Sequence, residues 1–160
     1  MIAGTSRGRS LSRARTARIL LALLALVSGC SDAPDEAPTI PALDAQPITY
    51  MDIEAARLAG PSCNYAAGHS MGAVVMAMND EAVMKIGGAL KRFTLDPQCD
   101  KLGKGTGSRY LAPGYVLDLA VKKESRRENA GTTGFSGSVS LSDGKGRVLY
   151  ATDGDVQCSG

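Results

Sequence analysis

Side chains suited to acid–base or nucleophilic catalysis are few and scattered along this chain of 160 residues. His69 is the single histidine, and its sequence neighbour Ser70 does not by itself indicate a catalytic geometry. Ser142 and Lys145 match a Ser-x-x-Lys pattern, but they lie in a Gly-rich hairpin loop rather than at a helix start. Residues 103–107 (GKGTG) lack the order of a phosphate-binding loop. We therefore predict no catalytic residues and no enzyme.

Metal chemistry is not indicated either. The four cysteines and the one histidine are dispersed, and they lack the ligand spacing of a zinc site. We predict no metal and no cofactor.

The N-terminus has the layout of a secretion signal. Residues 1–18 are basic, residues 19–27 (ILLALLALV) form an apolar stretch, and Ser28-Gly29-Cys30 follows. An apolar run of nine residues is typical of a signal peptide and is too short to span a bilayer as a stable helix. The sequence therefore predicts export.

Residues 27–30, Val-Ser-Gly-Cys, resemble the lipobox of bacterial lipoproteins, with Val27 in the place of the more usual Leu. The resemblance implies that the Cys30 thiol accepts a diacylglyceryl group, that acyl chains such as palmitate anchor the protein, and that cleavage precedes Cys30. More than one chain is needed for stable anchoring. Ser31, rather than Asp, favours the outer membrane with the domain facing the periplasm over retention in the inner membrane.

Residues 31–49 indicate a tether. Four of the seven prolines and four acidic residues lie here, with no basic residue. Proline fixes φ and removes a donor, so we expect an extended segment that reaches at most ~60 Å. The predicted organisation is a signal peptide (1–29), a lipidated cysteine with its tether (30–49) and a periplasmic β-domain (50–160).

The domain begins with one expected helix and continues as strands. Asp52 is the predicted helix cap, and Gly60-Pro61 ends the helix. The expected strands are short apolar or alternating segments bounded by turn residues, namely 73–78, 82–86, 90–95, 115–122, 135–141, 147–151 and 155–158. About seven short strands predict a mainly β fold, a small antiparallel barrel or sandwich preceded by one short helix.

Two further groups of residues have structural rather than functional interpretations. The charged run 122–129 (KKESRREN) is expected to be a solvated loop between strands, with contact to an anionic lipid or polymer as the minor alternative. Met71, Met76, Met78 and Met84 are expected to fill the core rather than to form a binding surface.

Lipidation of Cys30 leaves three cysteines for an oxidising compartment, so one disulfide and one remaining thiol are expected. We favour Cys63–Cys158, because it would join the start of the β-domain to its end. Cys99 would then be free or would join two chains. Cys63–Cys99 is a close alternative.

Residues 106–110 (TGSRY) carry a second resemblance. A small lipoprotein β-barrel with terminal cysteines and a Ser-Gly-x-x-Tyr loop is similar to the membrane-bound inhibitors of c-type lysozyme. Here Thr106 replaces the Ser, and Gly107 and Tyr110 match. The resemblance implies a binding loop that enters the lysozyme cleft. The family's second motif, Tyr-x-x-x-Thr-Lys-Gly, is not matched at residues 115–121.

The charge distribution argues against nucleic acid as a partner. The formal net charge is +2, but the first 29 residues hold five arginines and no acid, so the remainder has 13 basic and 16 acidic residues. That remainder shows no basic face. We expect an envelope lipoprotein that meets the membrane through Cys30 and binds an unidentified protein or cell-wall ligand. The alternatives are a lysozyme inhibitor, a cell-wall hydrolase and a structural subunit of an envelope complex.

Overall fold

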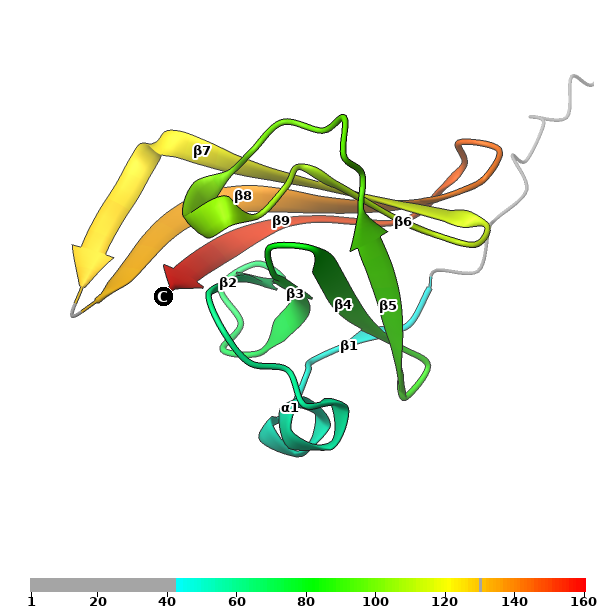
Figure 1. Cartoon of the computed structure of the whole chain (residues 1–160), viewed down its shortest axis with the longest axis horizontal. Coiled ribbons are helices and arrows are strands. Elements are labelled where there is room, and N and C mark those ends of the chain that lie inside the picture. Colours follow the sequence, from blue (N-terminus) through cyan, green and yellow to red (C-terminus); the bar gives the residue numbers. More distant parts are fainter. Residues whose placement is uncertain (1–42, 130) are drawn as a thin grey trace, which may run out of the picture. The chain divides into compact units, whose positions relative to one another are not determined.

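The computed structural model describes residues 43–129 and 131–160 (Figure 1). Lipidation of Cys30, the signal peptide and most of the expected tether lie outside the described residues. The elements are, in chain order, β1 (Ala45–Gln46), α1 (Tyr50–Ala56), β2 (Ser62–Ala66), β3 (Ala73–Ala77), β4 (Glu81–Ile86), β5 (Ala89–Leu95), a 3-10 turn (Gly103–Gly105), β6 (Arg109–Ala112), β7 (Tyr115–Asn129), β8 (Thr132–Asp143) and β9 (Val148–Ser159).

The strands form a closed antiparallel barrel. The hydrogen-bonded order is β1-β4-β3-β2-β9-β8-β7-β6-β5, and β5 pairs again with β4. That last pairing closes eight strands, β2 to β9, into a barrel and leaves β1 as an additional short strand on β4. Closure removes the exposed sheet edges that an open sandwich would have. The predicted mainly β fold with one short helix is confirmed, and of the two architectures the barrel is the one observed.

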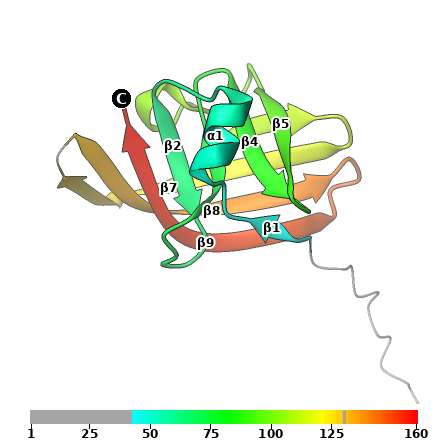
Figure 2. The same cartoon turned by 90° about the horizontal axis from the view of Figure 1, so that it is seen from below.

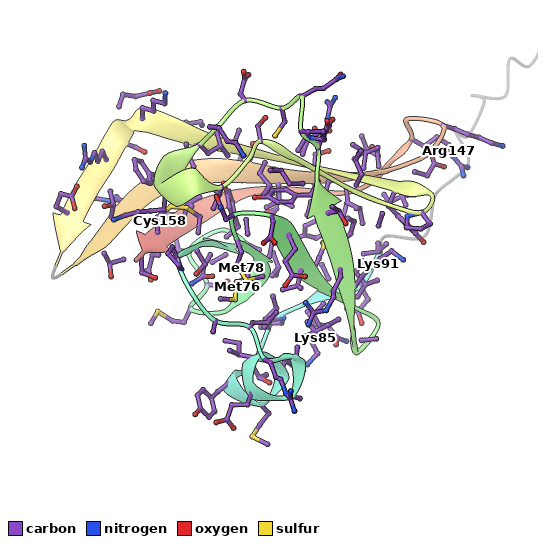
Figure 3. All side chains as sticks on the ribbon, viewed as in Figure 1. Met76, Met78, Lys85, Lys91, Arg147 and Cys158 are labelled. Carbon is purple, nitrogen blue, oxygen red and sulfur yellow. A yellow bond between two sulfur atoms is a disulfide. The ribbon has the colours of Figure 1, made fainter. Side chains whose placement is uncertain are left out.

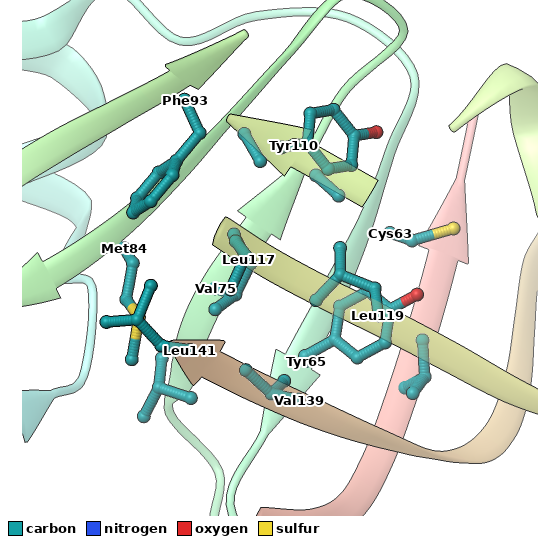
Figure 4. Packing of buried hydrophobic residues seen from close by; sticks show 14 of the residues in the cluster. Cys63, Tyr65, Val75, Met84, Phe93, Tyr110, Leu117, Leu119, Val139 and Leu141 are labelled. Atoms are coloured by element: carbon teal, nitrogen blue, oxygen red, sulfur yellow. The ribbon is translucent and has the colours of Figure 1, made fainter. Parts of the chain in front are cut away.

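Alternating side chains fill the interior. Leu117, Leu119 and Val139 belong to the inward rows of β7 and β8, and they pack with the larger rings of Tyr65, Phe93 and Tyr110 (Figure 4). An eight-stranded barrel is just wide enough for its side chains to fill it. Met76, Met78 and Met84 are buried, as expected for core filling, whereas Met71 is fully exposed.

The helix covers the outer surface of the barrel wall. Ile53 and Ala56 of α1 pack against Met76, Met78 and Val83, which face outward from β3 and β4 or lie just beyond them (Figures 2 and 3). The predicted cap was wrong by three residues. Thr49 is the N-cap, and Asp52 completes a capping box by accepting from the Thr49 backbone N–H at 2.7 Å.

The folded domain starts earlier than predicted. Residues 43–49 were assigned to the tether, yet Ala45 and Gln46 form β1 opposite Ile86 and Lys85 of β4. Leu43 packs against the barrel core, and its backbone N–H donates to the Leu149 carbonyl at 3.4 Å. The proline-rich composition does not prevent this short pairing, which uses the end of β4 beyond its pairing with β3.

The charged run 122–129 is a strand and not a solvated loop. It continues β7, which pairs with β8 along most of its length. The two predicted C-terminal strands are also one continuous strand, β9. β7 and β9 both pair with β8, and this backbone pairing supplies their hydrogen bonds. Polar side chains on the outer face therefore do not interrupt either strand.

Candidate binding site at the barrel mouth

One end of the barrel is fixed by a disulfide. Cys63 on β2 and Cys158 on β9 face each other in the strand register, and their sulfur atoms are 1.97 Å apart. Both side chains are fully buried. The predicted Cys63–Cys158 pairing is confirmed. Cys99, the alternative partner of Cys63, is a half-buried free thiol.

The 3-10 turn lies directly on this disulfide. A Cβ placed on Gly103 would be 3.7 Å from the Cys158 sulfur. The Thr106 hydroxyl donates to the Gly103 carbonyl at 2.7 Å, and the Thr106 backbone N–H donates to the same oxygen at 3.1 Å. These bonds hold the turn in place as a partial cover over the barrel end.

On the opposite side of this end, β7 bends away from the turn. Lys122 pairs with Ser136 and Arg127 pairs with Gly134, so residues 123–126 of β7 lie opposite the single residue Phe135. The bend is visible in the yellow strand of Figure 1. The Ser125 hydroxyl bridges the irregularity, because it donates to the Lys122 carbonyl at 2.6 Å and accepts from the Ser136 N–H at 2.7 Å.

A cavity of about 410 Å³ lies between the turn and the bent strand. We call it the mouth cavity, and its lining residues are Leu102, Gly103, Lys104, Val121, Lys123, Arg126, Thr133, Phe135 and Cys158. Its volume lies in the range of pockets that hold small molecules, and barrel mouths are among the places where such pockets occur. Phe135, Val121 and Leu102 give it an apolar floor that continues the barrel core.

The rim of the mouth cavity is basic. Lys104 Nζ donates to the main-chain oxygen of Gly160 at 2.7 Å, and the Arg126 guanidinium donates to Glu128. Arg126 and the Thr133 hydroxyl lower the pKa of the Glu128 carboxyl from its usual value, and Lys104 adds to this effect. Among the described residues, Lys123 has no acidic partner within 4.0 Å.

The predicted binding loop is not at the surface. Thr106 and Tyr110 are both fully buried. The Tyr110 hydroxyl donates to the Met78 carbonyl at 2.7 Å and accepts from the Gly107 N–H at 2.8 Å. A Cβ on Gly107 would lie 2.2 Å from Leu95 and 2.6 Å from the Cys99 sulfur. Thr106, Gly107 and Tyr110 are thus packed within the barrel wall, and in this conformation none of them presents a side chain to a partner.

The remaining chemically capable residues are dispersed. His69 contacts Asp155 at 3.1 Å and lowers the pKa of that carboxyl, but the imidazole is 95% exposed. A second hollow of about 400 Å³ is lined by polar residues that include Asp96, Arg109 and Asp118, and the closest pair in it is the ion pair of Arg109 with Asp118 at 2.6 Å. Within residues 43–129 and 131–160, no group of three or more His, Cys, Asp or Glu side chains is placed to hold a metal ion.

The sequence carries one signal for the mouth within the charged run 122–129. The inward row of β7 is Leu117, Leu119, Val121 and then Lys123, so its parity places the last lysine on the inner face. Lys122, one residue earlier, belongs to the outward row and pairs with Ser136. The bulge at residues 123–126 of β7, beside the cavity, has no comparable signal in the sequence.

Comparisons with protein-family models, with curated proteins and with solved structures found no match to this chain. In the part of the chain that the structure describes, no helix has the length and apolar character needed to cross a membrane.

Proposed function

We propose that this chain is a lipid-anchored envelope lipoprotein whose barrel is a non-catalytic binding domain, with the mouth cavity as its ligand site. The observation that carries the proposal is the cavity itself, which joins an apolar floor to a basic rim at the end of an otherwise filled barrel. A few polar groups above an apolar surface are the common composition of small-molecule sites.

The anchor and the location rest on the sequence. The Val27–Cys30 lipobox supports lipidation of Cys30, and Ser31 supports delivery to the outer membrane with the barrel in the periplasm. The Cys63–Cys158 disulfide is consistent with an oxidising compartment.

Ligand binding is tested by methyl NMR of the full chain in zwitterionic nanodiscs. Octanol, octanoate and octylamine are titrated separately while the methyl signals of Val121 and Leu102 are followed. Val148 is the internal control, because it is exposed at the opposite end of β9. We expect at least one of the three probes to shift the two mouth signals saturably and to leave Val148 unchanged. Saturation by none of them contradicts the proposal.

A cavity-filling variant sharpens the test. Val121→Trp places a large side chain on the floor of the mouth cavity, and we expect it to abolish the saturable shift at Leu102. Val116→Trp is the matched control, because Val116 lies on the same strand in the outward row opposite Ser142. Equal binding by wild type and Val121→Trp places the ligand elsewhere and counts against this site.

Inhibition of c-type lysozyme is the alternative function. Burial of Thr106 and Tyr110 favours small-ligand binding over inhibition through this segment. An inhibition assay with purified full chain distinguishes the two, because inhibition that survives Val121→Trp and is lost in Thr106→Ala would support the alternative.

A further inference from the structure

The mouth cavity changes from apolar to cationic along a single direction. On β7 the inward row runs from buried Leu117 and Leu119 through half-buried Val121 to Lys123. On β8 the facing row ends at Phe135 and Thr133. A ligand that enters along these rows meets cations first and apolar surface farther in.

Of the three cations at the rim, Arg126 is paired with Glu128 and Lys104 with the Gly160 oxygen, whereas Lys123 has no such partner among the described residues. Three basic side chains line the cavity and no acidic one does. Glu128 accepts from Arg126 outside the lining, and Lys104 is held by a main-chain oxygen. Lys123 therefore has no competing ion pair among the described residues, and its ammonium is available to an incoming anion.

We propose that the mouth cavity binds a small anionic amphiphile, with its apolar part on Phe135 and Val121 and its anionic group at Lys123. This inference rests on the proposed binding function and names the ligand class for the same cavity. A carboxylate, a sulfonate or a phosphate on a short apolar body has this chemistry. Burial of the apolar part supplies most of the affinity, and the charge at the rim supplies the orientation and the preference for anions.

Both a dissolved molecule and a bilayer lipid can present an anionic group on an apolar body, so the test includes an arm that distinguishes the two sources. Leu43, where the described chain begins, bonds to Leu149 at the start of β9, whereas the mouth lies beside Cys158. Nine residues of strand separate the two points, which corresponds to about 30 Å. Figure 3 shows Arg147 and Cys158 towards opposite ends of the molecule. The mouth therefore lies at the other end of β9 from Leu43.

The test compares three probes that share an eight-carbon chain and differ in charge: octanoate, octanol and octylamine. The full chain is held in zwitterionic nanodiscs, and the methyl signals of Val121 and Leu102 report occupancy. We expect octanoate to bind at least about fivefold more tightly than octanol, and octylamine to bind more weakly than either. Equal or tighter binding of octanol or octylamine overturns the anionic ligand class while the binding function stands. No binding by any probe contradicts both.

Two lysine variants test whether Lys123 causes the preference for octanoate over octanol. Lys123→Met keeps most of the side-chain length and removes the charge, and we expect it to bring octanoate to within twofold of octanol. Lys122→Met removes the neighbouring charge from the outer face and should leave the preference unchanged. Loss of the preference in both variants, or in neither, contradicts the role of Lys123. Thermal unfolding of both variants near the wild-type temperature shows that a change in the preference for octanoate does not come from loss of folding.

A separate arm distinguishes the two sources of an anionic ligand. The same methyl signals are recorded without octanoate in nanodiscs that contain an anionic phospholipid. Unchanged signals relative to zwitterionic nanodiscs would assign the ligand to solution. A shift at Val121 that Lys123→Met removes would show that a bilayer lipid reaches the mouth and is the anionic amphiphile that binds there.

Discussion

Two buried tyrosines of the same core differ in whether their hydroxyl groups have hydrogen-bond partners. Tyr110 and Tyr65 are both almost completely buried. The Tyr110 hydroxyl has two backbone partners, whereas the Tyr65 hydroxyl has none among the described residues. A buried hydroxyl without a partner loses its hydration and gains nothing in return. Sequence alone identified Tyr110 through a motif and assigned it to a surface loop, because a motif carries no information on burial.

Replacing each tyrosine by phenylalanine should therefore give opposite results. Tyr110→Phe leaves the Met78 carbonyl and the Gly107 N–H without their partner, and we expect a loss of about 1–3 kcal/mol in the free energy of unfolding. Tyr65→Phe removes an unpartnered hydroxyl and should be neutral or stabilising. Urea denaturation of the two variants measures the difference, and equal destabilisation would contradict this account of the core.

Among the elements, strands with alternating inward and outward side chains, or with a short apolar run, could be predicted from the sequence. Strands without such a pattern could not. Segments near 73–77, 82–86 and 115–121 were found because their inward residues alternate or form short apolar runs bounded by turns. Strands β2 and β6 were not predicted, because both adjoin turn-like sequence and the first half of β6 was assigned to the TGSRY loop. The charged half of β7 was misassigned because pairing with β8, a tertiary property, outweighs composition.

The bulge in β7 depends on one hydroxyl. Ser125→Ala removes the bridge between the Lys122 carbonyl and the Ser136 N–H, so a loss of about 1–2 kcal/mol is expected, together with faster hydrogen exchange at the Ser136 amide. Ser138→Ala, a change of the same size on the outer face of β8, is the control. Unchanged exchange at Ser136 would show that the bulge does not depend on Ser125.

The start of α1 predicts a specific response to acid. Asp52 accepts from Lys85 Nζ at 2.7 Å and from Thr49, which lowers the pKa of its carboxyl from 3.8 to about 2. A carboxyl whose pKa is lower in the folded state stabilises the fold above the unfolded value, and this contribution disappears as the pH falls from about 4 to about 2. Asp52→Asn should therefore flatten the loss of stability in that interval.

Denaturation at a series of pH values between 5 and 2 measures this effect. Asp153→Asn is the control, because Asp153 is exposed on β9 away from the helix. The same steepness in wild type and Asp52→Asn would exclude a contribution from the capping box.

At the scale of the whole molecule, the chain closes on itself through β2 and β9. These strands come from opposite ends of the barrel sequence, and the disulfide joins them across 95 positions. A covalent link across so long a loop restricts the unfolded chain strongly. The sequence favoured this pairing because it joins the start and the end of the β-domain, but it left Cys63–Cys99 open, and the cavity beside the disulfide depends on the turn and on the irregularity in β7.

Removing the disulfide should cost the barrel a large part of its stability. We expect Cys63→Ala combined with Cys158→Ala to lower the free energy of unfolding by about 4–5 kcal/mol in the chain-entropy description. Cys99→Ala removes a half-buried free thiol and should have a much smaller effect. Chemical denaturation under non-reducing conditions compares the three proteins, and a double variant as stable as Cys99→Ala would contradict the role assigned to the link.

The proposed compartment and the membrane anchor both depend on cleavage before Cys30 and on its acylation. Mass spectrometry of the protein isolated from the cell envelope tests this directly, with Cys30→Ala as the control. The account predicts a mature chain that begins at Cys30 and carries the mass of a diacylglyceryl group on it. An unmodified Cys30, or a chain that retains residues 1–29, would contradict it.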